Sequence, residues 1–127
     1  MLTDEETLNQ LSRRVIGCAL GVASTLGVGF AERVYGNALV HEVRKAGLVA
    51  ARQRGITVWY DGIIIGEYVA DILIEDALLV ELKAVKALND GHRAQCLNYL
   101  KATGLRLCLL LNFGTPRLEI KRVVLGL

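Results

Sequence analysis

Apolar residues recur along this chain with two periods, one typical of helices and one typical of strands. The first helical stripe, with gaps of three or four residues, consists of Leu8, Leu11, Val15, Cys18 and Val22. This spacing places the side chains on one face of an α-helix. A capping-box pattern at Thr3 and Glu6 would start the helix, and the glycines at 27 and 29 would end it.

The same reasoning predicts two more helices. One runs from about 31 to 46 and stops at Gly47, and its apolar stripe is Tyr35, Leu39 and Val43. Another covers about 90 to 103, where Asn89-Asp90 can cap its start and Gly104 can end it.

Extended segments are indicated by short apolar runs between turn residues. They are 56–60, 63–74, 78–85, 105–112 and 118–125. Asp61-Gly62 predicts a hairpin turn between the first two, and Gly114-Thr115-Pro116 a turn between the last two. Trp59, which lies in a predicted strand, is expected in the core rather than at a base-stacking surface.

The order of these elements, two helices, three strands, one helix and two strands, favours an α/β fold with a mixed sheet between helical layers. A hydrophobic content of 53% favours a sheet covered on both faces. A chain of 127 residues is long enough for one core, so residues 1–127 are predicted to form a single domain.

Composition predicts a cytoplasmic protein. The N-terminus is polar and acidic, unlike a signal peptide, and no apolar stretch approaches the roughly 20 residues of a membrane span. Cys18, Cys96 and Cys108 show no paired spacing and lie in apolar segments, which favours small core residues in a reducing compartment.

Candidate chemistry is concentrated in segment 68–83, YVADILIEDALLVELK. Two apolar runs flank Glu75-Asp76, so the segment is predicted to be a β-hairpin. A three-residue turn at 75–77 would set Asp71 directly opposite Glu81, with Lys83 on the same face. Two carboxylates and an amine on such apolar strands are unfavourable unless they bind something, and a divalent cation and a phosphate would serve.

A third acid is predicted to point at the sheet from the second helix. Glu32 lies in its first turn, on the stripe that should face the strands. An acid there can also simply interact with the helix dipole. With Asp71 and Glu81 it would complete an oxygen-only ligand set, which suits Mg²⁺ or Mn²⁺ rather than zinc.

Two features leave alternatives open. Lys83 can orient or deprotonate an attacking water, or it can be a solvated lysine paired with Glu81. On the third helix, His92, Gln95 and Tyr99 form one polar stripe that can contact substrate, or that can be a helix flank resting on the sheet.

Net charge is only +2, which by itself argues weakly for a nucleic-acid partner. Setting aside Glu32, Asp71, Glu81 and Lys83 leaves 14 of the 15 basic and 10 of the 13 acidic residues. This surplus is compatible with a basic rim that attracts a polyanion and equally with an ordinary solvated surface.

Assembled in order, these motifs resemble the GxxExxY family of the PD(D/E)XK nuclease superfamily. The signature is Gly29-Phe30-Ala31-Glu32-Arg33-Val34-Tyr35, followed by Gly66-Glu67-Tyr68-Val69-Ala70-Asp71 and Val80-Glu81-Leu82-Lys83-Ala84. A QxxxY motif, as in RecB-like exonucleases, runs from Gln95 to Tyr99, and the ending LNFGTPRLEIKRVVL is also similar.

The resemblance implies a three-layer α/β/α restriction-endonuclease-like core that hydrolyses phosphodiester bonds in nucleic acid, with DNA as the favoured substrate. Glu32, Asp71, Glu81 and the backbone carbonyl of Leu82 would bind Mg²⁺ or Mn²⁺. Lys83 would serve the nucleophilic water. The residues expected to contact substrate or support the site are Gln95, Tyr99, His92 and Tyr35.

Two rival functions follow from the same residues. The fold could serve as a nucleic-acid-binding or assembly module without turnover, because a small domain leaves little surface beyond its core to grip a duplex. It could also be an oligomeric scaffold whose acids are merely hydrogen-bonded. A homodimer is compatible with every version, since a second subunit would enlarge the footprint.

Overall fold

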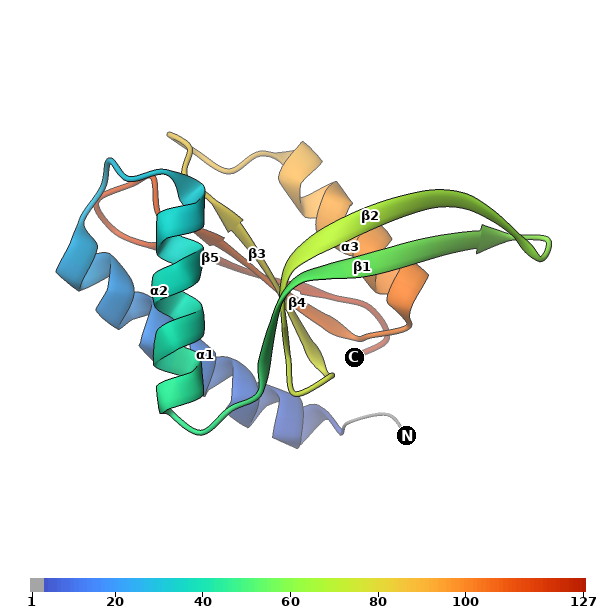
Figure 1. Cartoon of the computed structure of the whole chain (residues 1–127), viewed down its shortest axis with the longest axis horizontal. Helices are drawn as coiled ribbons and strands as arrows, with labels where there is room; N and C mark the ends of the chain where they lie inside the picture. The colour runs from blue at the N-terminus through green and yellow to red at the C-terminus, as the bar shows by residue number, and fades with distance from the viewer. Residues whose placement is uncertain (1–3) are drawn as a thin grey trace.

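The computed structural model describes residues 4–127 (Figure 1). Its elements are α1 (Glu5–Leu26), α2 (Glu32–Lys45), β1 (Ala50–Tyr60), β2 (Ile63–Ile74), β3 (Leu78–Lys83), α3 (Asp90–Thr103), β4 (Leu107–Asn112) and β5 (Glu119–Val124). The predicted element order is confirmed. β1 begins six residues earlier than predicted and β3 ends two residues earlier.

One five-stranded mixed sheet organises the molecule. The strands lie in the order β1-β2-β3-β4-β5, and every neighbouring pair is antiparallel except β3 and β4, which are parallel. α1 and α2 pack on one face of the sheet and α3 on the other, so the predicted three-layer arrangement with a mixed sheet is confirmed (Figure 1).

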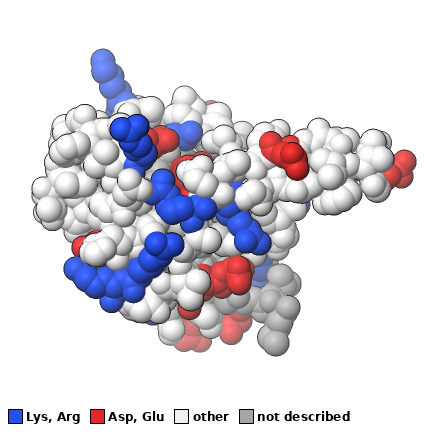
Figure 2. Space-filling model, viewed as in Figure 1, with Lys and Arg blue, Asp and Glu red and all other residues white. Residues whose placement is uncertain are grey.

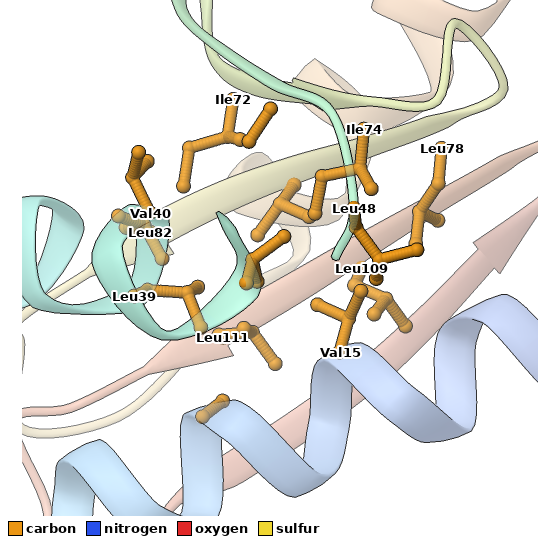
Figure 3. Packing of buried hydrophobic residues seen from close by; sticks show 14 of the residues in the cluster. Val15, Leu39, Val40, Leu48, Ile72, Ile74, Leu78, Leu82, Leu109 and Leu111 are labelled. Carbon is orange, nitrogen blue, oxygen red and sulfur yellow. The ribbon is translucent and has the colours of Figure 1, made fainter. Parts of the chain in front are cut away.

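Alternation along the buried strands divides the core between the two faces. Ile72, Val80 and Leu82 belong to the cluster under α1 and α2. Leu79, Cys108 and Leu110 belong to the cluster under α3. Figure 3 shows the first cluster, in which Val15 and Leu39 from the helices meet Leu109 and Leu111 from β4. The site-bearing strands β2 and β3 are therefore held between two apolar layers.

Helix ends follow the chain's capping residues. Asp4 caps α1 by accepting a hydrogen bond from the backbone N–H of Thr7, and Gly27, with φ of 67°, follows the last turn. The predicted capping box includes Thr3, which lies outside the described residues. Asn89 caps α3 as predicted, and the partner that completes its capping box is His92.

The outer halves of β1 and β2 form a projecting hairpin, residues 55–69, which we call the arm (Figure 1). Its turn at Asp61 and Gly62 has positive φ at both residues, as a two-residue hairpin turn requires. The arm is largely apolar yet exposed. Trp59, at 62% exposure, is not in the core, so that expectation was wrong, as was full coverage of the sheet.

Among residues 4–127, no helix is long and apolar enough to cross a membrane.

Candidate active site

The hairpin of β2 and β3 has the predicted register. Ile74 pairs with Leu78 and Ile72 with Val80 across a turn at 75–77, where Glu75 and Asp76 have positive φ. Continuing this register by one residue sets Asp71 opposite Glu81. The two carboxylates are thus brought together at the end of the paired region, where the strands begin to separate.

At this point, hydrogen bonds from backbone N–H groups to the two carboxylates take the place of backbone–backbone hydrogen bonds between the strands. The backbone N–H of Asp71 donates to Oε1 of Glu81 at 2.9 Å, and the backbone N–H of Leu82 donates to Oδ2 of Asp71 at 2.8 Å. Each carboxylate therefore satisfies a main-chain donor of the opposite strand. The exchange fixes both side chains and leaves each with one further oxygen for a ligand.

Glu81 is 3% exposed, although it carries an ionisable group. Burial, and then the negative charge of Asp71, raise the pKa of Glu81 to about 8, against an ordinary value of 4.5. The hydrogen bond from Asp71 and the charge of Lys83 act in the opposite direction. Such strong perturbation of a buried acid beside a second acid is typical of functional sites.

Lys83 and Glu32 lie around this pair. The ammonium group of Lys83 lowers the pKa of both Glu32 and Glu81, although burial and Asp71 raise each more strongly. The structure gives Lys83 no ion pair within residues 4–127, so the alternative of a lysine bonded to Glu81 is not what is found. Its amine remains available beside the acids.

Glu32 is exposed in the first turn of α2. Although the residue as a whole is exposed, partial burial of its carboxyl group, and then the charge of Asp71, raise its pKa, so this carboxyl group lies within electrostatic range of Asp71. However, no group of three or more His, Cys, Asp or Glu side chains in the described part of the chain is close enough to hold a metal ion. The predicted convergence of Glu32, Asp71 and Glu81 on one ion stays a prediction.

The donor set nevertheless fits a hard divalent cation. Asp71 and Glu81 present carboxylate oxygens, and burial, followed by the charge of Asp71, makes the ionised form of Glu81 unfavourable without a positive partner. A cation of the Mg²⁺ type would neutralise this pair, and its preferred ligands are oxygens.

α3 covers the pair from the opposite layer. Tyr99 is buried, and after burial itself the charges of Glu81 and Asp71 raise its pKa to about 12, so its phenol stays a proton donor at neutral pH. Gln95, one turn earlier, is half-buried. His92 instead accepts a hydrogen bond from the backbone N–H of Asn89 through Nδ1, which commits it to the helix cap.

Tyr35 does not make the predicted substrate contact. It is 1% exposed, and its ring stacks on Phe113 with centroids 4.8 Å apart. Its hydroxyl donates to the carbonyl of Gly27 and accepts from the N–H of Phe30. Tyr35 therefore ties down the loop that leads into α2, the helix whose first residue is Glu32, and its ring and hydroxyl are occupied by these contacts.

Sequence reasoning missed Asn112, a buried amide in apolar β4. Its Oδ1 accepts from the N–H groups of Val85 and Gly114, and its Nδ2 donates to the carbonyl of Val85 and to Glu119. Asn112 pairs with Lys83 in the β3–β4 register, so it clamps the chain two residues after that lysine. An isolated Asn in an apolar strand followed by Gly114 was the available signal.

Comparisons with known proteins agree with this geometry. A family model described as the PD-(D/E)XK nuclease superfamily matches residues 9–123. The crystal structure of SSO0001 is similar, with a TM-score of 0.59 and 15% identity over 75% of this chain and 50% of that one. The chain thus spans half the length of that protein. The restriction-endonuclease-like fold predicted from sequence is confirmed.

An alkaline exonuclease from Laribacter hongkongensis shows a weaker likeness, with a TM-score of 0.42 and 14% identity over 98% of this chain and 72% of the other. No curated protein matches the sequence.

Proposed function

Because the chain belongs to the PD-(D/E)XK nuclease superfamily, we propose that it is a metal-dependent nuclease that hydrolyses phosphodiester bonds in DNA. The observation that carries this proposal is the pairing of Asp71 with Glu81 where β2 and β3 separate, with the amine of Lys83 nearby. Within the superfamily, we propose that it belongs to the GxxExxY group, which its motifs resemble, with Gln95 and Tyr99 as its QxxxY motif.

The residues that would hold the cation are Asp71, Glu81 and the backbone carbonyl of Leu82, with Glu32 completing the set from α2. When bound, Mg²⁺ or Mn²⁺ supplies Lewis acidity, which polarises a phosphate and lowers the pKa of a bound water. The protein's own contribution is to hold the acids rigidly, because each is already hydrogen-bonded to the facing strand.

Lys83 would orient the attacking water and offset negative charge that develops on the phosphate. The phenol of Tyr99 and the amide of Gln95 would donate hydrogen bonds to substrate from the α3 side of the acids. Because Nδ1 of His92 accepts a hydrogen bond in the helix cap, His92 would fix the start of α3 and so the position of Gln95, while its Nε2 would contact substrate.

Residues 1–127 are proposed to work as one nuclease domain in the cytoplasm, where the three free cysteines stay reduced. A homodimer is proposed through three exposed apolar residues on the β2 side of the arm, Ile63, Ile65 and Val69. Sedimentation of the wild type against an Ile65→Lys variant tests it, since a charge in that face would dissociate the dimer.

A second function is favoured by one observation. The acids of the described residues do not form a three-member metal group, so the same fold could bind nucleic acid without cleaving it. Such a module would show salt-dependent binding and no cleavage with any divalent ion.

Incubation with single-stranded, double-stranded and branched DNA, and with matched RNA, in Mg²⁺, Mn²⁺ or EDTA distinguishes these functions. The wild type is expected to cleave DNA only with a divalent ion, and Lys83→Ala to lose at least 100-fold, on the order of what one charge-stabilising group contributes. Lys86→Ala, an exposed lysine three residues away, is the matched control. Equal activity in the wild type and Lys83→Ala would refute the nuclease assignment.

A further inference from the structure

A hollow lies between the arm and α3. It has a volume of about 360 Å³ and is lined by Val58, Trp59, Tyr68, Asn98, Lys101 and Ala102. This volume falls within the range of small-molecule sites in proteins. Figure 1 shows the arm passing alongside α3, and the hollow is formed where these two elements face each other.

Aromatic rings make up the arm side of this hollow. Trp59 is 62% and Tyr68 49% exposed. Burying either ring against an apolar partner would be favourable, so these exposed rings indicate a binding surface. The charged residues of the arm are Asp61 and Glu67, and Figure 2 shows that the rest of its visible face is uncharged. An exposed pair of rings of this kind offers flat apolar faces to a flat apolar ligand.

The α3 side of the hollow is polar. Asn98 and Lys101 are both exposed there, one helical turn apart. An amide can donate to and accept from the edge of a base, and an ammonium group suits a phosphate. A nucleotide carries all three features that the walls complement: a flat base, hydrogen-bonding edges and a negative phosphate.

An aromatic contact links the wall of the hollow to the candidate active site. The ring of Tyr68 contacts the ring of Tyr99, with centroids 5.7 Å apart and planes inclined at 50°. Tyr99 in turn lies within electrostatic range of Glu81 and Asp71. Gln95 and Asn98 are three residues apart on α3, so one helix face runs from the acids to the hollow.

We propose that this hollow is a stacking subsite for an unpaired nucleobase, with Trp59 and Tyr68 as the platform and Lys101 on the adjoining phosphate. It would hold the nucleotide next to the scissile phosphate, and so would direct the enzyme to single-stranded or frayed substrate. The subsite rests on the proposed nuclease function for its substrate. Ring stacking tolerates any base, so the subsite would select strandedness rather than sequence.

Trp59 is the only tryptophan in the chain, so its fluorescence reports directly on this subsite. A metal-free titration in EDTA with a single-stranded oligothymidylate is expected to quench its emission. A strand with abasic residues and the same number of phosphates is expected to leave the emission unchanged. Equal quenching by the two strands, or unchanged emission with the strand demonstrably bound, would overturn the proposal.

Variants locate the contact. Trp59→Ala and Tyr68→Ala are each expected to weaken binding of a labelled single strand roughly 5- to 150-fold, the range found for loss of one base–aromatic stack. Tyr60→Ala is the matched control, because Tyr60 is an exposed neighbour, at 68%, that does not line the hollow. Equal losses in all three variants would contradict a specific platform.

Binding and cleavage can fail separately. Quenching in EDTA without cleavage in Mg²⁺ would refute the nuclease function and leave the stacking subsite standing, whereas cleavage without quenching would do the reverse. A second copy of the chain is the other occupant to consider. Emission of free Trp59 that shifts with protein concentration, together with protection from iodide, would show that another subunit covers the hollow, and would overturn the proposal.

Discussion

Replacing Glu81 with Gln should stabilise the metal-free protein at alkaline pH while abolishing cleavage. The substitution keeps a side-chain oxygen that can accept the N–H of Asp71, as Oε1 of Glu81 does at 2.9 Å, and it removes the charge. Because burial and Asp71 raise the pKa of Glu81 to about 8 from 4.5, folding favours the protonated acid. Its stabilising contribution is complete below pH 4.5 and is lost as the pH rises to about 8.

The size of the effect follows from that difference in pKa. At pH 8 the wild type would be destabilised by roughly 4 kcal/mol through this group, and at pH 5 by about 1 kcal/mol. The Gln variant lacks the titration, so its advantage should grow by about 3 kcal/mol between pH 5 and pH 8. For a domain of this size that is a shift in Tm of roughly 10 °C.

Urea unfolding in EDTA, followed by circular dichroism at the two pH values, measures the difference. Glu67→Gln, which removes one exposed glutamate from the arm, is the control, and its effect should stay within about 0.5 kcal/mol at both pH values. An advantage of Glu81→Gln that is the same at pH 5 and pH 8 would refute the argument that the acid is buried in a destabilised state.

Two other substitutions test how the site is held. Gly114→Ala should lower the free energy of unfolding by more than about 2 kcal/mol in the same urea assay, because its new Cβ would clash with the carbonyl oxygen of Val85. A free energy of unfolding within about 0.5 kcal/mol of wild type would show that the segment held by Asn112 can move. Tyr35→Phe keeps the stacked ring and loses the hydroxyl's hydrogen bonds to Gly27 and Phe30, so it should lower the free energy of unfolding by about 1 kcal/mol. It should also reduce cleavage severalfold, because the loop that leads to Glu32 is less firmly held. Unchanged cleavage would mean that the loop keeps its position without the hydroxyl.

The hairpin that carries the acids could be predicted because its sequence leaves one solution. Glu75 and Asp76 interrupt two apolar runs, so the turn has to lie there, and the register of Asp71 and Glu81 follows from counting outwards. Helix ends were equally predictable. The side chain of Asn89 caps the start of α3, and Gly27 and Gly104 follow the last turns of α1 and α3. These features depend on residues that are close together in the sequence, so the sequence alone predicts them.

Features set by non-local geometry were not predictable. β1 and β2 have 11 and 12 residues while β3 has six, so the outer parts of the long strands extend beyond their cover. Apolar alternation cannot reveal this, which is why Trp59 was expected in the core. The start of β1 was missed because Arg52, Gln53 and Arg54 are polar, and Gln53 has a φ of 54° that no strand pattern suggests.

The candidate site was predictable to the same depth. The pairing of Asp71 with Glu81 is a matter of register, but the approach of Glu32 depends on a loop and on a flexible side chain at a helix end. The clamp of Asn112 depends on β4 lying beside β3, a contact between strands joined through a whole helix. The spacing of residues along the chain therefore predicts neither the approach of Glu32 to the acids nor the contacts of Asn112 with the segment after β3.

α3 buries few side chains, and this has a consequence for how the protein would lose function on heating. α3 buries only Cys96, Tyr99 and Leu100, whereas α1 buries six residues along its length. Local opening of α3 is thus expected to cost less free energy than opening of α1, and its amides should exchange with deuterium before those of α1. Since Gln95 and Tyr99 leave with it, heat inactivation would precede the cooperative melting of the sheet.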